Sequence, residues 1–172
     1  MSTSEIAFRA LHEDDFTLIS QTLANWWDDW GDPGATAQRQ LLLPPLFFQH
    51  FSDTSTAAVD ATGEIVGYLV GFLSQSRVNE SYIHFVGVHP NKQGQGLGAT
   101  LYTRFFDLCV RRGVTKVSCV TSPGNTGSIG FHRAMGFDIV PGRLGPEGVD
   151  VQPNYDGPGL DRVCFTKSLR CL

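Results

Sequence analysis

Three glycines at alternate positions stand between a predicted strand and a predicted helix. They are Gly94, Gly96 and Gly98, within SYIHFVGVHPNKQGQGLGATLYTRFFDL at 81–108. A strand at 82–88 that leads through this loop into a helix would place unpaired backbone N–H groups at the positive end of a helix dipole, with no side chains in the way. Such a loop can cradle a phosphate. An ordinary solvent turn is the plainer interpretation of the same glycines.

A histidine interrupts the apolar pattern of the strand before this loop. His84 stands within YIHFVGV, and the two-residue spacing places it on one strand face with Glu80 and Tyr82. Polar residues that contradict the local pattern cluster at functional sites. We therefore treat His84 as a candidate catalytic residue.

Composition limits the partners that such a site can serve. The chain has 172 residues, long enough for one domain over 1–172 with a substantial core. Its 41% hydrophobic and 17% charged residues are typical of a globular protein. The net charge of −4 offers no attraction for a nucleic acid or an anionic membrane, so we predict neither as a partner and favour a small or cationic one.

Targeting signals and metal motifs are not visible in the sequence. The longest apolar run, Ile65–Leu73, is far shorter than the roughly 18 residues of a spanning helix, and the start of the chain lacks an export signal. We predict a cytoplasmic protein. The four cysteines have no CxxC spacing, which favours buried free thiols over disulfides or metal ligands, and we predict no metal.

The predicted elements alternate along the chain. Strands are expected where apolar residues alternate or run continuously between turn signals, and helices where they recur every three or four residues. The expected strands cover 6–11, 57–61, 65–74, 82–88, 114–121, 137–140 and 162–168, and the expected helices 16–25, 36–43, 97–112 and 125–135. This order predicts an α/β domain with a mixed sheet of about seven strands and helices on both faces.

Two segments have no assigned regular structure. The stretch LFFQHF at 46–51 follows Pro44 and Pro45, and its helix or loop state is left open. Residues 141–161 are rich in glycine and proline. A loop of this length is either functional or disordered.

The glycine loop also matches part of the dinucleotide-binding fingerprint. Gly94, Gly96 and Ala99 fit GxGxxG/A, but that motif needs an acidic residue about 20 positions further on, and the next strand, VSCVTS, has none. The loop also follows strands of antiparallel type rather than the first turn of a parallel sheet. A P-loop is excluded because no Lys-Ser/Thr pair follows the glycines.

Two stretches resemble the signatures of one family. VHPNKQGQGLG at 88–98 resembles that of the GNAT superfamily of acetyl-CoA-dependent N-acetyltransferases, a strand ending in V-x-P followed by R/Q-x-x-G-x-G/A, with Gln93, Gly96 and Gly98 at its defining positions. NTGSIGFHRAMGF at 125–137 resembles the second signature, N-x-x-S/A-x-x-F-Y-x-x-x-G-F. Two motifs in the right order are far more specific than either alone.

The resemblance implies a GNAT-like three-layer α/β/α fold with about seven mixed strands, four helices and splayed central parallel strands. It also implies acetyl-CoA as the co-substrate. Backbone N–H groups of the loop would hold the pyrophosphate, the strand backbone would pair with the pantetheine, and two residues of the second motif would contact the coenzyme from the opposite side. These residues are, in that order, Gln93, Gly94, Gln95, Gly96, Leu97, Gly98 and Ala99; Val86, Gly87 and Val88; and Asn125 and Ser128. Asn125 could equally be a helix N-cap.

The implied reaction is transfer of an acetyl group to a primary amine of a small molecule or a peptide, by direct attack in a ternary complex. Most members place a tyrosine as general acid where this chain has His132. Histidine can donate a proton near neutrality, and it can equally pack beside the coenzyme. The family's general base often lies on the central strand, which makes His84 our candidate base.

The acceptor is expected beside the segment that joins the first two helices. Trp27, Asp28 and Asp29 could bind an ammonium group by cation–π and Coulomb attraction, and Tyr155 could belong to the opposite wall. The alternative is that the tryptophans form core or a homodimer contact and that the aspartates are solvated caps.

Two further function classes stay open. A non-catalytic acyl-CoA-binding regulatory module would share the coenzyme site, with His132 marking loss of the family tyrosine. A dinucleotide-binding oxidoreductase is the third reading. Release of thiol from acetyl-CoA in the presence of amine acceptors distinguishes an acetyltransferase from the regulatory module. Whether NADH or acetyl-CoA raises the melting temperature distinguishes the oxidoreductase from both.

Overall fold

The computed structural model describes residues 6–27, 33–146 and 148–169, which fall into two compact units. The first unit comprises Met1–Phe72 and Ile83–Leu108, and the second comprises Leu73–Tyr82 and Cys109–Leu172. The expectation of a single domain over 1–172 stays a prediction.

Seven strands follow the hydrogen-bonded order β1-β2-β3-β4-β5-β9-β6. Neighbours pair antiparallel in β1–β2, β2–β3, β5–β9 and β6–β9, and parallel in β4–β5. The mixed α/β class is therefore confirmed. The strands are β1 (Ala7–Ala10), β2 (Thr56–Val59), β3 (Ile65–Leu73), β4 (Glu80–Val88), β5 (Lys116–Thr121), β6 (Asp138–Ile139) and β9 (Val163–Ser168).

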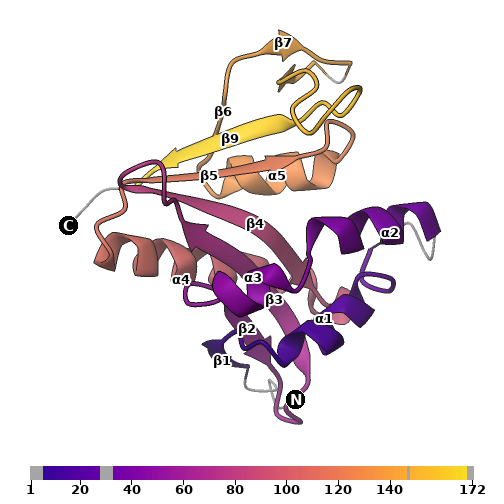
Figure 1. Ribbon diagram of the computed structural model, residues 1–172, viewed down its shortest axis with the longest axis vertical. Helices are drawn as coiled ribbons and strands as arrows, with labels where there is room; N and C mark the ends of the chain where they lie inside the picture. The colour runs from indigo at the N-terminus through magenta and orange to yellow at the C-terminus, as the bar shows by residue number, and fades with distance from the viewer. Residues whose placement is uncertain (1–5, 28–32, 147, 170–172) are drawn as a thin grey trace. The chain divides into compact units, whose positions relative to one another are not determined.

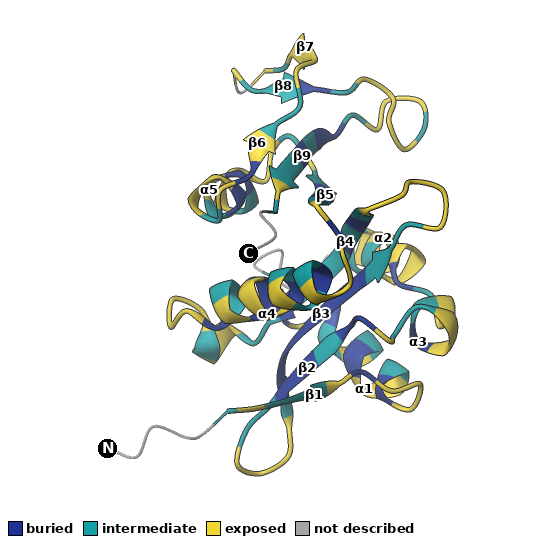
Figure 2. Ribbon diagram, turned by 90° about the vertical axis from the view of Figure 1, so that its left-hand side faces the viewer, coloured by how far each residue is buried: buried dark blue, intermediate teal, exposed yellow. Residues whose placement is uncertain are grey.

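The first unit has helices on both sides of its strands (Figure 2). Helices α1 (Asp15–Thr22), α2 (Pro33–Leu42) and α3 (Leu46–His50) cover one face, and α4 (Leu97–Arg111) covers the other. Side chains from α1, α3, β2, β3 and the segments that join the elements form one core on the first face: Leu11, Ile19, Leu23, Trp26, Leu43, Phe48, Ala57, Tyr68 and Val70.

Glycines in β3 let α4 approach the other face closely. A Cβ atom on Gly71 would lie 2.6 Å from a ring carbon of Phe105, and one on Gly67 would lie 3.1 Å from Leu97. Both positions therefore need glycine for packing. They are the two glycines that interrupt the longest apolar run of the sequence.

The boundaries of two helices differ from the predicted ones. Helix α1 ends at Thr22 rather than near Asn25, and α2 begins at Pro33 rather than Thr36. Proline is well suited to a first helical turn because its missing N–H has no intrahelical acceptor there. The stretch after Pro45, left open above, forms the short helix α3.

The second unit packs α5 (Thr126–Ala134) against its strands, and Figure 1 shows α5 running along β5. The loop at 141–161 is ordered in part by a two-stranded ribbon, β7 (Arg143–Leu144) with β8 (Asp150–Val151). Ion pairs of Arg162 with Asp156 (2.6 Å) and Arg143 with Asp161 (2.8 Å) also fix it. We did not predict this ribbon, because two-residue strands leave no periodic signal among glycines and prolines.

Strand β4 passes from the second unit into the first. Its register with β5 covers Glu80 to Tyr82, opposite Lys116 to Ser118, whereas the strand continues to Val88. The splay of the central strands stays a prediction. No helix among the described residues is both long and apolar enough to cross a membrane.

Candidate active site

The glycine loop has the conformation that its sequence requires. A short 3₁₀ turn, η1 (Pro90–Lys92), leads to Gly94 and Gly96, whose φ angles are +70° and +82°. L side chains rarely adopt such angles. No heavy atom beyond the chain neighbours lies within 4 Å of the position that a Cβ atom would take at either glycine, so the loop is open on the Cβ side of both.

The loop ends at the N-terminus of α4, which begins at Leu97. The first hydrogen bond of this turn joins Thr100 N to Gly96 O at 3.0 Å, so the preceding N–H groups have no acceptor within the helix. These groups and the dipole of a helix of 15 residues favour negative charge. The residues present therefore fit a pyrophosphate group.

Side chains within the loop hold its backbone. Gln95 Nε2 donates to Asn91 O at 2.7 Å, and Gln93 Nε2 donates to Val88 O at 3.3 Å. The backbone N–H of Asn91 donates to His89 Nδ1 at 3.1 Å. The two glutamines of the motif thus order the loop around its glycines.

The last residues of β4 present their backbone in two directions. His89 N donates to Val66 O of β3 at 2.9 Å. Because backbone groups alternate along a strand, Gly87 also faces β3, and Val86 and Val88 face away from it. The outward direction is the one that a pantetheine chain would need in order to pair with this strand.

His84 is held by a hydrogen bond and a ring stack. Its Nε2 lies 2.5 Å from Leu42 O, and its ring stacks on Phe47 with centroids 4.0 Å apart and an interplanar angle of 12°. A carbonyl oxygen can only accept, so Nε2 carries the proton and the lone pair of the neutral ring is on Nδ1. Any base chemistry of His84 therefore proceeds through Nδ1.

The strand departs from regular alternation beside His84. Phe85 is the next residue, yet its ring contacts Trp27 and Tyr68 in the layer that also holds Phe47. A regular strand would send these two neighbours to opposite faces. Both side chains are consequently directed into the α1–α3 layer.

His132 is buried within the second unit. It is 6% exposed, its ring stacks on Phe165 at 4.6 Å, and its edge meets Phe137 at 5.4 Å. Nδ1 donates to Ser128 O at 2.7 Å, which places the proton on Nδ1. Burial lowers the pKa of His132, although the bond to Ser128 O opposes this shift. The neutral ring then has no proton on Nε2, which favours the packing interpretation, and the proton-donor assignment stays a prediction.

The second predicted coenzyme segment lies at the start of α5. Asn125 Oδ1 accepts a hydrogen bond from Ser128 N at 3.0 Å, so Asn125 is the N-cap of the helix. The hydroxyl of Ser128 lies 3.2 Å from His132 Nδ1. The proposed contacts of both residues with coenzyme A stay predictions.

The predicted acceptor residues fall in different parts of the chain. The guanidinium carbon of Arg39 lies 5.0 Å from the centroid of the Trp27 ring, and Arg39 Nε donates to Leu23 O at 2.7 Å. A cation of the protein thus already occupies one face of Trp27. Asp28 and Asp29 lie outside the described residues.

Tyr155 is exposed on the ordered loop of the second unit and hydrogen-bonds to Tyr82. Partial burial, together with nearby Cys164 and Asp156, raises the pKa of Tyr155 despite this bond, so its hydroxyl is protonated near neutrality. The buried Arg162 guanidinium, bound to Asp156 and to Ser122 Oγ at 3.1 Å, supports the loop beside it.

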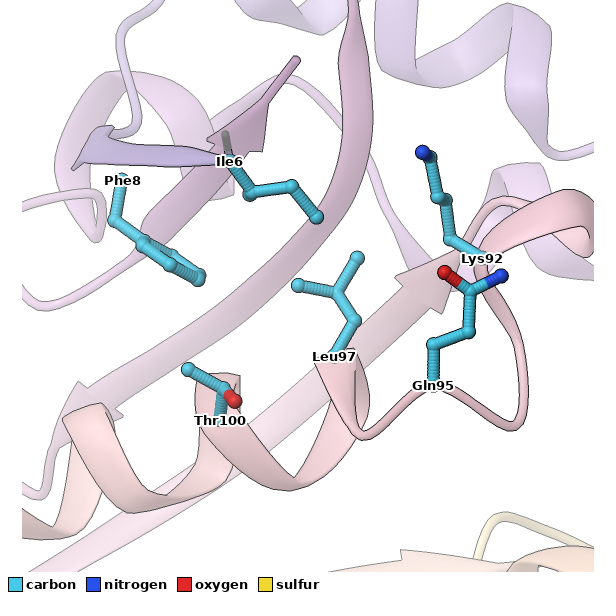
Figure 3. Close-up of a pocket in the computed structure, with 6 residues that line it drawn as sticks. All are labelled: Ile6, Phe8, Lys92, Gln95, Leu97 and Thr100. Atoms are coloured by element: carbon cyan, nitrogen blue, oxygen red, sulfur yellow. The ribbon is translucent and has the colours of Figure 1, made fainter. Parts of the chain in front are cut away.

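A small pocket lies beside the glycine loop in the first unit (Figure 3). It has a volume of about 220 Å³, and the side chains of Ile6 and Leu97 point toward one another across it. Its full lining is Ile6, Phe8, Lys92, Gln95, Leu97 and Thr100. Among the described residues, no group of three or more His, Cys, Asp or Glu side chains is arranged to hold a metal ion.

Comparison with known proteins decides the family. Residues 16–137 match the acetyltransferase (GNAT) family, which is well over half of the chain. The chain belongs to the acetyltransferase (GNAT) family. The predicted enzyme class, an acetyl-CoA-dependent N-acetyltransferase, is confirmed at the level of the family.

Individual GNAT proteins agree over most of the chain. An acetyltransferase of Pectobacterium atrosepticum is 27% identical over 135 residues, 77% of this chain and 87% of its own. A probable acetyltransferase of Staphylococcus epidermidis has the same fold, with a TM-score of 0.75, 10% identity, and coverage of 96% of this chain and 100% of its own. Diaminobutyrate acetyltransferase of Paenibacillus lautus, solved with its substrate L-2,4-diaminobutyric acid and coenzyme A, has a TM-score of 0.65, 19% identity and 96% coverage of both chains.

Three features of the GNAT domain were not predicted from the sequence. They are the carbonyl of Leu42 that fixes the His84 ring, the guanidinium of Arg39 over Trp27, and the ring of Tyr68 beneath Gly87. Each joins residues that are far apart in the chain. Tyr68 lies inside an apolar strand, where its hydroxyl was the one available signal.

Proposed function

We propose that this GNAT protein binds acetyl-CoA and transfers its acetyl group to the primary amine of a small molecule. The observation that carries the proposal is the open loop with left-handed Gly94 and Gly96, followed at once by the N-terminus of α4. Backbone N–H groups from Gln93 to Ala99 would bind the pyrophosphate. Acetyl-CoA, when bound, supplies an activated thioester carbonyl.

The backbone of Val86 to Val88 is proposed to orient the pantetheine and to polarise the carbonyl. Outward-facing peptide groups can pair with the pantetheine amides as a neighbouring strand would. A backbone N–H in this segment can donate to the carbonyl oxygen, where negative charge develops during attack. Holding both reactants in place supplies much of the rate enhancement.

His84 is proposed to accept the proton of the attacking amine. Its Nε2–H is fixed on Leu42 O and its ring is held by Phe47, so the basic atom is Nδ1. Removal of a proton is required because an ammonium group has no lone pair with which to attack. The assignment concerns proton transfer at His84 and does not depend on the acceptor.

A small amine with an additional charged group is the acceptor class that we favour. The similar protein from Paenibacillus lautus was solved with its substrate L-2,4-diaminobutyric acid. In the present chain, Arg39 already covers one face of Trp27, so cation–π attraction to that face is used within the protein. The panel of amines tested as acetyl acceptors should include amino acids and diamines as well as peptides.

Thermal melting with two ligands tests the coenzyme. We expect acetyl-CoA to raise the melting temperature and NADH to leave it unchanged, because the loop lacks the ribose-binding acid of a dinucleotide site. Release of thiol from acetyl-CoA should then be measured against the amine panel. Stabilisation by NADH alone would contradict the proposal.

Substitution of His84 tests the base. We expect His84→Gln to lower kcat by about 10²-fold at pH 7, as is typical for loss of a general base, with a smaller loss at higher pH where more amine is already neutral. The affinity for acetyl-CoA, measured by calorimetry, should stay within about twofold of wild type because the substitution leaves the loop intact. Unchanged turnover from pH 6 to 9 would remove His84 from the mechanism.

A non-catalytic acyl-CoA-binding module is the second candidate. It is favoured by one observation, the neutral and buried His132 at the position of the family tyrosine. Such a protein would bind acetyl-CoA and release no thiol with any acceptor. The amine panel therefore distinguishes the two functions directly.

A further inference from the structure

We propose that Tyr68 is a positioning residue for acetyl-CoA: its buried ring determines the course of the β4 backbone at Gly87. The inference rests on the proposed function, because it concerns the strand along which acetyl-CoA would bind. Tyr68 is in β3, in the middle of the first unit, and contacts the strand from beneath.

The strand lies directly on the phenol. A Cβ atom at Gly87 would lie 2.5 Å from Tyr68 Cζ and 2.7 Å from its hydroxyl oxygen. Side-chain carbon atoms do not approach one another this closely, so no residue larger than glycine fits without movement of the ring or the strand. The Gly87 position therefore leaves no room for a side chain on the face toward the Tyr68 ring.

The ring is held on three sides. Its hydroxyl lies 3.1 Å from Thr22 Oγ1, and since Thr22 donates to Ile19 O, Tyr68 is the donor in this contact. Phe85 stacks parallel to it at 6.4 Å, and Trp26 lies at 5.6 Å. Tyr68 is fully buried. An added methyl group at Gly87 would therefore displace the strand more readily than the ring.

Ring contacts continue from Tyr68 along the end of β4 that is proposed to bind the pantetheine. Trp26 also meets His89 edge to face at 5.4 Å. The rings of Phe85, Tyr68, Trp26 and His89 therefore support the chain from Phe85 in β4 to His89 just after it. This segment contains the outward peptide groups of Val86 and Val88. A shift of the strand over these rings would move those peptide groups.

The catalytic consequence follows from the sensitivity of polar contacts to distance. Donors that stabilise a developing oxyanion act at about 2.7–3.1 Å, and a misplacement of about 1 Å can cost 10²-fold in rate. A rigid aromatic support beneath the peptide would keep such a donor in place. Glycine at position 87 then reflects the size of Tyr68 rather than a requirement for unusual backbone angles.

A double-mutant cycle tests the contact. The variants are Gly87→Ala, Tyr68→Leu and the double variant, and the readouts are Kd for acetyl-CoA by calorimetry and kcat. We expect Gly87→Ala to raise Kd by roughly tenfold and to lower kcat, because the strand moves off its position. In the Tyr68→Leu background, which makes room for the methyl group, Gly87→Ala should change Kd by no more than about twofold.

Gly71→Ala is the matched control. Its Cβ atom would meet Phe105 at 2.6 Å, so it introduces a similar clash in a neighbouring strand, on the face toward α4. We expect it to lower the melting temperature and to leave Kd for acetyl-CoA of the folded protein within about twofold of wild type.

Each outcome of the cycle supports or overturns the inference. Coupling between positions 87 and 68, with no effect of Gly71→Ala on Kd, supports it. The same factor for Gly87→Ala in both backgrounds, or wild-type Kd in Gly87→Ala, overturns it and leaves the proposed function intact. Failure of the wild-type protein to bind acetyl-CoA overturns both proposals.

Discussion

At the residue level, burial and hydrogen bonding decide what each histidine can do. Both candidate histidines donate one ring N–H to a backbone carbonyl, which fixes the tautomer. His84 is partly exposed on the central strand, whereas His132 is enclosed by Phe165, Phe137 and the turn of α5. The same residue type can thus be a base in one place and a packing group in the other.

Replacement of His132 separates packing from proton donation. Its lowered pKa means that the folded state favours the neutral ring, so the stabilisation is complete above the unfolded pKa of about 6.5 and is lost as pH falls through the folded pKa. We expect the free energy of unfolding of wild type to decrease more between pH 7.5 and 5.5 than that of His132→Phe. Urea unfolding at the two pH values measures the difference.

The same variant should keep its activity if His132 is a packing residue. We expect kcat of His132→Phe to stay within about threefold of wild type at pH 8. His50→Gln, at an exposed site in α3, is the matched control for the loss of a histidine. A loss of kcat of about 10²-fold without loss of stability would instead identify His132 as the general acid.

At the level of elements, β4, the glycine loop and α4 follow one another in the chain and together form the proposed coenzyme site. The strand supplies outward peptide groups, and the loop turns the chain so that the N-terminus of α4 follows within a few residues. Glycine is needed at Gly94 and Gly96 for backbone angles, at Gly87 for space beneath the strand, and at Gly71 for the approach of α4. These are two different physical requirements met by the same residue.

Substitution in the loop should affect binding beyond its effect on stability. Gly96→Ala places a side chain at a φ of +82°, which costs about 1–2 kcal/mol, and the methyl group points into open space where the pyrophosphate is proposed to bind. We expect Kd for acetyl-CoA to rise by more than about tenfold.

Gly63→Ala is the matched control, because Gly63 has a φ of +87° and equally open surroundings in the β2–β3 turn. It should lose similar stability, measured by urea unfolding, and retain Kd for acetyl-CoA. Equal effects of the two substitutions on Kd would contradict a specific role of the loop.

At the level of the whole molecule, two strands and one helix connect the compact units. The boundary between the units falls within β3, before Leu73, within β4, after Tyr82, and within α4, after Leu108. Unfolding of either unit would remove part of a strand that the other uses. We therefore expect the units to unfold together, as the single-domain prediction requires.

The chain carries a natural reporter in each unit. All three tryptophans lie at 26–30, in the first unit, and all four cysteines lie at 109–171, in the second. Tryptophan fluorescence and thiol reactivity should give the same urea midpoint, because Cys109 and Cys119 are buried in the native state. Separate midpoints would show two independent domains.

The sequence by itself determined the local elements and the family. Glycine spacing, apolar periodicity and the two signatures predicted the strand, loop and helix of the proposed coenzyme site and the mixed sheet, because backbone angles and amphipathic patterns depend on neighbouring residues. The short ribbon β7–β8 was not predicted because two-residue strands leave no periodic pattern. The start of α2 at Pro33 was missed although proline favours a first helical turn.

Only the tertiary structure decided how the site is supported. The bond from His84 to Leu42 O spans 42 residues, and the contact between Tyr68 and Thr22 spans 46. No local pattern encodes such pairs, because they depend on which helix faces which strand after packing. The fold therefore adds to the glycine loop a tautomer for His84 and a buried ring under Gly87, and these contacts turn a predicted anion site into a testable active site.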